Sequence, residues 1–318
     1  MENIDLKDRK ILYYLNENSR ESFRSIGRKV GLSKDVIASR IKKMQEKGII
    51  QEFYIHFNHL GLGYIPLRFY FKFQYITSEI KDEIIDHFIN YKLATVVNEL
   101  EGTYDLIVLM LVEHITDIYS FWQTTMDKFG DYFEKIEYSN YWGEIIYPFS
   151  FLLDGKEERT NTIKRFWTKN IEYDKLDLKI LKILSLNARI STIDLANKLK
   201  INSTTVNNRI KRLKQAGLLL GFTTKIDWKK LGYHLYKIDF YLKEYSKKHR
   251  IIKYVEENPN LLAVDHTLGY ADLELEIFLK NVDDLREFVD DLSIKFPKTI
   301  KNYSYFMVMK NHKFFILK

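Results

Sequence analysis

One stretch of the sequence occurs twice, and this internal repeat limits the chain to folds built from two similar halves. The segment LSKDVIASRIKKMQEKGII at 32–50 matches INSTTVNNRIKRLKQAGLL at 201–219. Arg40 and Arg209 mark the same place in the two copies, 169 positions apart. A duplicated domain is therefore the first prediction from the sequence.

Each copy of this stretch has the pattern of a helix with one apolar face. A capping residue comes first, Ser33 or Asn202, and apolar residues then follow at helical spacing. Gly48 and Gly217 come after the last turn, where a left-handed C-cap is common. Small polar and basic residues fill the other face, so one face suits a core and the other suits a polar, anionic partner.

The residues before each copy complete a larger motif. Asp8–Leu15 and Asp177–Leu184 repeat the pattern D-x-K-I-L-x-x-L, with apolar residues at i, i+3, i+4 and i+7. A second short helix is predicted at about Ser22–Val30 and again at Ser191–Leu199. Three short helices with a tight turn before the third indicate a helix-turn-helix, whose third helix enters the DNA major groove.

The charge is distributed unevenly along the chain, and its distribution favours DNA as a partner. The whole chain carries +7, of which residues 1–50 contribute +5 and residues 171–222 contribute +6. Residues 51–150 carry −9 and residues 223–318 carry +3. Basic helix-turn-helix segments suit the phosphate backbone of double-stranded DNA, because counterion release drives such binding.

Composition excludes several other classes of protein. The chain contains no cysteine, which rules out a disulfide framework or a thiolate metal site and favours a cytoplasmic location. The first ten residues lack the apolar core of a signal peptide. The most apolar run, Leu106–Val112, is too short to span a membrane, so no membrane partner is expected.

The segment after each helical region predicts a second kind of domain. Strict alternation of apolar and polar residues indicates a half-buried strand, with apolar positions at Leu67, Phe69, Phe71 and Phe73 and again at Tyr236, Ile238, Phe240 and Leu242. A helix, two strands around a turn, a helix and a last strand follow in both copies. This is the βαββαβ order of a ferredoxin-like unit. Its sheet needs a partner on the face without helices, and we expect the aromatic residues to face a second sheet.

The predicted fold class is therefore α+β, a tandem duplication of a helix-turn-helix domain followed by a ferredoxin-like domain. The expected boundaries are 1–52 and 171–222 for the helix-turn-helix domains, 53–153 and 223–318 for the ferredoxin-like domains, and 154–170 for a polar linker.

In this order of elements the whole chain resembles two fused copies of an Lrp/AsnC (feast/famine) transcriptional regulator. The resemblance rests on D-x-K-I-L-x-x-L at Asp8 and Asp177, on the helix pattern V/I-x-x-R-I-x-x-[LM]-x-x-x-G, and on G-x-x-D at 102–105 and 269–272. Each copy would join the helix-turn-helix to a C-terminal RAM-type sensing domain.

The resemblance implies a partner arrangement and an effector site. RAM domains of the family pack sheet to sheet as dimers, so this chain is expected to form an intramolecular pseudo-dimer, with room for higher homo-oligomers. A small effector such as an amino acid would bind near the G-x-x-D turns, at Gly102, Asp105, Gly269 and Asp272. The alternative is a plain hairpin turn in which each Asp caps its own backbone. No cofactor is implied.

Candidate DNA contacts lie on the polar faces of the two repeated helices. They are Lys34, Ser39, Arg40, Lys42, Lys43, Ser203, Thr204, Thr205, Asn207, Asn208, Arg209, Lys211 and Arg212. Asn can bond adenine through two hydrogen bonds, whereas Lys serves phosphates or guanine. Asp35 near the groove would repel phosphates, so the first copy should read fewer bases. Arg40 and Arg209 would either reach a phosphate or brace their own domain, and the alternative for the rest is a merely solvated face.

No catalytic motif and no metal site is predicted. His56 and His59 are interpreted as ordinary surface histidines, because no acidic or thiolate set accompanies them at ligand spacing. Siroheme decarboxylases resemble the same architecture, but such an enzyme would need His and Arg residues converging on the cavity between the sheets. The sensing domains carry only Arg68, Arg250 and Arg286. The prediction is a sequence-specific DNA-binding regulator and not an enzyme, with a sensor that has lost DNA binding as a further alternative.

Overall fold

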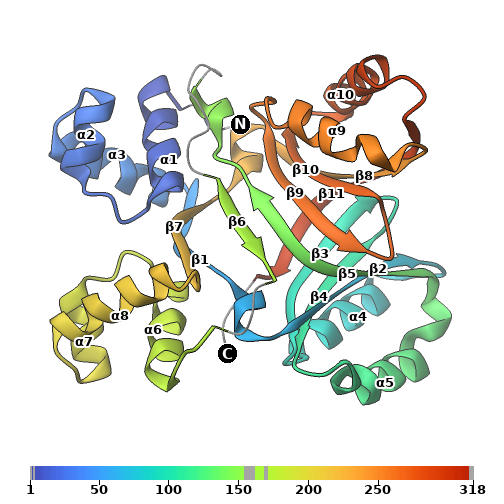
Figure 1. Ribbon diagram of the computed structural model, residues 1–318, viewed down its shortest axis with the longest axis horizontal. Coiled ribbons are helices and arrows are strands. Elements are labelled where there is room, and N and C mark those ends of the chain that lie inside the picture. The colour runs from blue at the N-terminus through green and yellow to red at the C-terminus, as the bar shows by residue number, and fades with distance from the viewer. Residues whose placement is uncertain (1, 3, 154–161, 168–170, 315–318) are drawn as a thin grey trace.

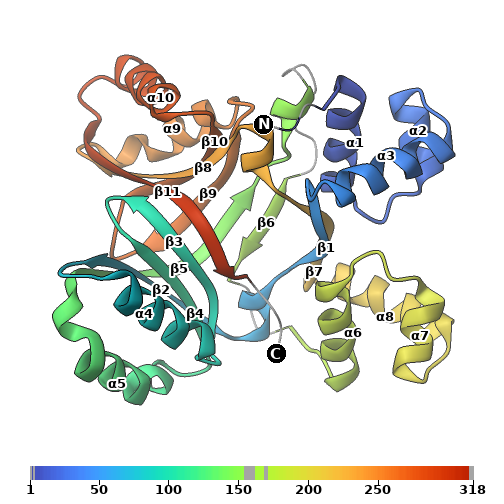
Figure 2. The ribbon, with the colours of Figure 1, turned by 180° about the vertical axis from the view of Figure 1, so that it is seen from behind.

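The computed structural model of the protein describes residues 2, 4–153, 162–167 and 171–314. Figure 1 shows two small helical lobes on one side and two strand-rich lobes on the other. A two-stranded ribbon, β1 with β7, runs between the two sides. Seen from behind in Figure 2, helices α4, α5, α9 and α10 lie on the outside of the strands.

Each helical lobe contains three helices at the places that the repeat predicts. They are α1 Leu6–Glu17, α2 Phe23–Val30 and α3 Lys34–Glu46 in the first lobe, and α6 Lys175–Leu186, α7 Thr192–Leu199 and α8 Ser203–Gln215 in the second. The side chains of Ser33 and Asn202 cap α3 and α8 by accepting backbone N–H groups of the first turn. Gly48 and Gly217 have φ values of +66° and +74°. The predicted caps and the helix-turn-helix are confirmed.

The strands that leave the two lobes pair with each other, and each completes the core of the other copy's lobe. β1 (Ile50–Phe57) and β7 (Leu219–Ile226) are antiparallel neighbours. Ile226 of the second copy packs into the core of the first lobe, whereas Ile55 and Phe57 of the first copy pack into the second. The two halves are thus interlocked rather than placed side by side.

Hydrogen bonds strengthen this exchange between the copies. The hydroxyl of Thr224 on β7 donates to the carbonyl of Leu15 at the end of α1, over 3.1 Å. On the other side, the backbone N–H of Ala188, after α6, donates to the carbonyl of Phe53 on β1 over 2.8 Å. Any movement of the ribbon is therefore transmitted to both lobes.

The remaining elements form the predicted βαββαβ unit twice. The first unit consists of β2 Ile65–Phe73, α4 Ser78–Asn90, β3 Ala94–Gly102, β4 Leu106–Val112, α5 Tyr119–Phe129 and β5 Phe133–Ile146. The second consists of β8 His234–Leu242, α9 Lys248–Val255, β9 Leu261–Leu268, β10 Leu273–Leu279, α10 Val282–Lys295 and β11 Ile300–Lys313.

The two sheets join at both edges and close into a single barrel. Strands follow the order β2-β4-β3-β11-β8-β10-β9-β5, and β5 pairs again with β2. The joints are β3 with β11 and β5 with β9, each an antiparallel pair between the two copies. The copies pair within one chain, as expected, but they share one closed hydrogen-bond network instead of only stacking face to face.

Many large apolar residues of the strands face the helices, and a smaller, mainly aromatic set faces the inside of the barrel. Phe69 and Phe71 of β2 pack in one core with Phe88 of α4 and Phe129 of α5. Arg68, between Leu67 and Phe69, points into the barrel instead, where it bonds residues of the second copy. The expectation that the aromatic residues meet a second sheet therefore holds only in part: Tyr70 and Tyr104 pack against Phe306 of the other copy inside the barrel, whereas the aromatic residues of the larger core pack against helices.

The predicted linker contains a strand. Within 154–170 the structure describes Thr162–Trp167, and Ile163–Phe166 form β6, which pairs with the edge of β5. The other linker residues lie outside the described residues. β6 also contacts the ribbon side, because the guanidinium of Arg165 donates to the carbonyl of Phe57 over 3.0 Å. This stretch is therefore not a simple tether.

Candidate nucleic-acid interface and central cavity

The third helices present most of the predicted DNA contacts to solvent. Exposed side chains belong to Lys34, Ser39, Lys42, Lys43, Ser203, Thr204, Asn207, Asn208, Lys211 and Arg212, whereas Arg40, Thr205 and Arg209 are half-buried. Thr205 is already engaged, since its hydroxyl donates to the capping carboxamide of Asn202 over 2.8 Å. Asn207 accepts a 3.2 Å hydrogen bond from Thr192 of α7, which orients its amide.

The two equivalent arginines are held by carboxylates of their own lobes. Arg40 donates to Asp5 and Asp8, each over 2.8 Å, at the start of α1. Arg209 donates to Asp174 and Asp177 at the start of α6, the latter over 3.2 Å. Of the two roles left open for these arginines, the geometry shows the one that braces the domain.

Arg212 shares the same acidic site in the second lobe. Its guanidinium bonds Asp177, whose side chain is completely buried. The hydrogen bond from Arg209, with the N–H groups of the first turn, lowers the pKa of Asp174 to about 2. The second lobe therefore ties Arg209 and Arg212 to the start of α6, and the equivalent carboxylates of the first lobe bind Arg40.

The aspartates of the G-x-x-D turns are engaged with the backbone of their own sheets. Asp105 accepts the N–H of Phe73 over 2.7 Å, and Asp272 accepts the N–H of Leu242 over 2.7 Å. Each carboxylate thus fastens its turn to the end of the neighbouring strand. This is a backbone-capping role of the kind that the hairpin alternative describes.

The glycines of these turns need their positive φ angles, and the residues beside them fill the barrel. Gly102 has φ of +126°, and a Cβ there would lie 2.7 Å from the carbonyl oxygen of Tyr305; Gly269 has φ of +91°. Between each Gly and Asp a tyrosine turns inward. The hydroxyls of Tyr270 and Tyr104 form a 3.1 Å hydrogen bond with each other, so the two turns close one end of the barrel.

A buried ion network crosses the inside of the barrel from one copy to the other. Arg68 lies 2.6 Å from Glu274 and 2.9 Å from Asp265. Lys237 lies 2.8 Å from Glu274 and also contacts Asp265. All four side chains are at most 8% exposed. The two cations neutralise the two carboxylates, which offsets the loss of hydration that burial imposes on all four charges.

Asp239 lies next to this network but forms no ion pair with any residue that the structure describes. Its side chain is fully buried and accepts a 3.1 Å hydrogen bond from the hydroxyl of Tyr270. Burial, with the negative charge of Glu274 nearby, raises the pKa of Asp239 to about 8. The carboxyl group is therefore largely protonated and neutral at pH 7.

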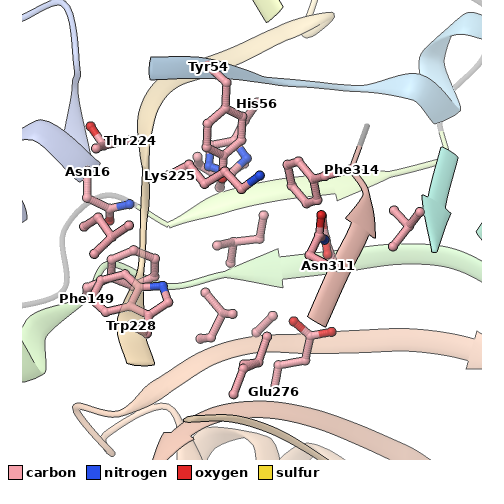
Figure 3. A pocket seen from close by; sticks show the side chains of 18 of the residues that line it. Asn16, Tyr54, His56, Phe149, Thr224, Lys225, Trp228, Glu276, Asn311 and Phe314 are labelled. Carbon is pink, nitrogen blue, oxygen red and sulfur yellow. The ribbon is translucent and has the colours of Figure 1, made fainter. Parts of the chain in front are cut away.

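A cavity of about 1100 Å³ lies between the ribbon, β6 and the interior of the barrel (Figure 3). Arg68 and Lys237 of the ion network lie on its barrel side, and Tyr54, His56 and Lys225 of the ribbon lie opposite. The helix ends of both lobes reach its rim. The cavity therefore touches every domain of the chain.

His56 and His59 both line this cavity, so the prediction that they are ordinary surface histidines is wrong. His59 is 2% exposed, and its ring stacks on Tyr141 with centroids 6.2 Å apart. Burial, helped by the positive charge of Arg165, lowers the pKa of His56 to about 3 and that of His59 well below its usual value. Both imidazoles are neutral at pH 7.

Sequence reasoning missed these cavity residues because β6 was assigned to the linker. Arg165 pairs with Glu144 and donates to the carbonyl of Phe57 on β1, close to both histidines, of which His59 is buried and His56 half-buried. The apolar first and last residues of the segment, Ile163 and Phe166, were its local signal of a strand.

Among the described residues no group of three or more His, Asp or Glu side chains is placed to hold a metal ion. In the same part of the chain no helix is long and apolar enough to cross a membrane.

Comparisons with known proteins agree with the two helical lobes. Residues 4–45 match the AsnC-type helix-turn-helix domain, and residues 173–219 match a winged helix-turn-helix DNA-binding domain. The HTH-type transcriptional regulator Ptr1 of Methanocaldococcus jannaschii is 35% identical over 117 residues, which are 36% of this chain and 78% of that protein. The chain belongs to the Lrp/AsnC family of transcriptional regulators.

Other relatives show how this Lrp/AsnC member differs from a single regulator. LrpC of Bacillus subtilis is 25% identical over 123 residues, covering 39% of this chain and 85% of LrpC. In both cases the aligned region covers little more than a third of this chain but most of the regulator. The Lrp/AsnC chain described here is about twice as long as they are.

One solved structure has the fold of the whole chain. The siroheme decarboxylase NirDL, in complex with an iron-uroporphyrin III analogue, aligns over 98% of this chain and 95% of that one, with a TM-score of 0.65. The identity is 11%, so this likeness shows a shared architecture of the Lrp/AsnC type and nothing about activity.

Proposed function

We propose that this Lrp/AsnC protein is a sequence-specific DNA-binding regulator whose two different helix-turn-helix lobes bind one asymmetric site. The observation that carries the proposal is the ribbon, which fixes two exposed basic third helices, α3 and α8, to one rigid pair of strands. Covalent fusion makes the two readers different, so the recognised half-sites should differ too.

The experiment is a binding-site selection followed by titrations of the selected duplex at several salt concentrations. Two basic helices on one duplex should give a strongly negative slope of log affinity against log salt, because each phosphate contact releases counterions. A slope near zero with no selected sequence would contradict the proposal. That outcome would favour a sensor that no longer binds DNA.

The resemblance extends the proposal to a small-molecule effector such as an amino acid near Gly102, Asp105, Gly269 and Asp272. The two turns differ, GTYD against GYAD, so two identical effector sites are not expected. Because both carboxylates already hold backbone N–H groups, an effector would have to bind the remaining oxygens or the turn backbone. Calorimetric titration with the common amino acids tests this part of the proposal.

A second candidate function is a siroheme-decarboxylase-like enzyme. It is favoured by one observation, the presence of His56, His59, Arg68 and Arg165 around a single large cavity. Sequence reasoning found too few such residues, because three of these four, His56, His59 and Arg165, lie outside the strands of the ferredoxin-like units. Titration of the protein with an iron porphyrin distinguishes the candidates: a saturable shift of the absorption band that is lost in His59→Ala supports the enzyme. Unchanged spectra speak against it.

A further inference from the structure

The two faces of the ribbon contact different parts of the molecule. On one face, Ile55 and Phe57 pack into the core of the second lobe, and Ile226 packs into the core of the first. On the other face, Tyr54 and His56 point into the cavity, as Figure 3 shows. A molecule in the cavity would therefore press directly on the element that carries both lobes.

The walls of the cavity suit an apolar, aromatic molecule. Ile107, Leu109 and Val308 belong to the inner face of the barrel, yet each stays half-buried because the space in front of it is open. Rings surround the mouth: Tyr54 stands edge-on to Phe314, with centroids 5.5 Å apart (Figure 3). A volume of about 1100 Å³ matches the upper end of small-molecule sites.

The charge at the mouth selects an anion. Arg68, Lys237 and Arg165 are already paired with carboxylates. Lys225 is different: its half-buried ammonium lies over the Phe314 ring, 5.5 Å from the centroid. No carboxylate of the described residues forms an ion pair with it. Lys214, Lys229 and Lys310 also line the cavity without an ion pair among the described residues, so Lys225 is one of several cavity-lining cations that no carboxylate pairs, and it stands next to aromatic rings.

We propose that the cavity is a binding site for a small aromatic anion, with Lys225 as its counter-charge, and that its occupancy is coupled to DNA binding by the two lobes. This site differs from the G-x-x-D turns, which lie at the closed end of the barrel beside Tyr104 and Tyr270. The coupling rests on the proposed DNA-binding function. The binding site itself does not depend on it.

The first test uses two fluorescent probes that differ only in charge. 8-Anilinonaphthalene-1-sulfonate is an aromatic anion, and N-phenyl-1-naphthylamine is the same scaffold without the sulfonate. The folded wild type should bind the sulfonate with a defined stoichiometry of one. Lys225→Gln should weaken the sulfonate roughly tenfold and leave the neutral probe unchanged, since it removes one charge-assisted contact.

Matched variants locate the binding. Lys301→Gln removes an exposed lysine on a different strand, β11, and should not change the affinity for either probe. Leu109→Trp fills the cavity and should abolish binding of both probes, and Val308→Trp does the same from a different strand. Leu268→Trp adds the same ring at a position that is 65% exposed and should have no effect. Circular dichroism of each variant establishes that it is folded. Binding that survives both cavity-filling variants, or ignores Lys225→Gln, overturns the site.

The second test measures the coupling by fluorescence anisotropy of a selected duplex. Saturating sulfonate probe should change the affinity of the wild type for DNA, and DNA should change the affinity for the probe by the same factor. In Leu109→Trp the probe should have no effect on DNA binding. Probe binding without any change in DNA affinity would overturn the coupling. A protein that binds the probe but no DNA would overturn the proposed regulator and leave the site standing.

Discussion

The guanidinium of Arg68 on β2 donates to the carboxylate of Glu274 on β10 over 2.6 Å, and both side chains are almost completely buried. These residues are 206 positions apart and belong to different copies of the repeat. The bond places a charge pair at the centre of the barrel, where the sequence predicts only the polar side of a strand. It also makes the stability of each sheet depend on the other.

Removing the guanidinium of Arg68 should lower the free energy of unfolding substantially. Arg68→Met leaves Asp265 and Glu274 facing Lys237 alone, and loss of one partner of a buried pair typically costs about 3–5 kcal/mol. Urea unfolding followed by circular dichroism measures the loss in the free energy of unfolding. The control, Arg286→Met, breaks an exposed pair with Asp283 and should cost less than about 1 kcal/mol. Equal effects of the two substitutions would contradict the role of burial.

The raised pKa of Asp239 predicts a specific pH dependence of stability. The folded protein keeps the proton until pH about 8, whereas the unfolded chain releases it near the ordinary aspartate pKa of 3.8. The folded state therefore binds more protons between these values, and stability falls as pH rises through that window, by up to about 1.4 kcal/mol per pH unit for this group.

Asp239→Asn should remove this part of the decline. Its carbonyl oxygen can still accept the hydrogen bond from Tyr270, so the variant should gain stability over the wild type progressively from pH 4 to 8. The measurement is the urea midpoint at a series of pH values. Asp283→Asn, at a side chain that is 76% exposed, is the control and should follow the wild-type profile. Parallel curves for wild type and Asp239→Asn would show that the carboxyl is ionised.

Arg40 should matter for the first lobe rather than for the phosphate backbone. Arg40→Ala frees Asp5 and Asp8 at the start of α1, so the thermal unfolding temperature should fall. The salt slope of DNA binding should stay as in the wild type. A slope reduced by about one, with unchanged unfolding, would instead assign Arg40 to a phosphate.

The two lobes should contribute differently to DNA recognition. Asn207→Ala combined with Asn208→Ala should cost about 1–3 kcal/mol for each lost two-bond contact with adenine and relax specificity in one half-site. Lys42→Ala, at a side chain that is 78% exposed, should weaken all sequences alike and lower the salt slope by about one. Binding-site selection at fixed salt separates the two effects. Equal weakening on every sequence for the Asn pair would show that α8 does not read bases.

The interlocked copies should stay together after the chain is cut. A protease site inserted between residues 153 and 162 separates the halves covalently but leaves the β1–β7, β3–β11 and β5–β9 pairings intact. The cleaved fragments should elute together from a sizing column at the volume of the uncut protein. Elution as two independent species would contradict the pseudo-dimer.

Local pattern alone was enough to predict the helices and the order of the strands. Caps such as Ser33 and Asn202 and turn glycines such as Gly48 act within a few residues, so the signals that define an element lie inside it. The repeat supplied each of these signals twice. The duplicated helix-turn-helix and the βαββαβ order follow from such local rules.

The residues of the cavity and of the barrel interior were decided by contacts between distant parts of the chain. Alternation in β2 separates Phe69 from Arg68 but does not say which face meets the helices and which meets the other copy. β6 is defined by the edge of β5, and this pairing places Arg165 against the segment that carries His56 and His59. Apart from β6, the sequence by itself determined the elements, because their energetics are local. The tertiary structure decided where the charges lie, because burial and compensation depend on residues of the opposite copy.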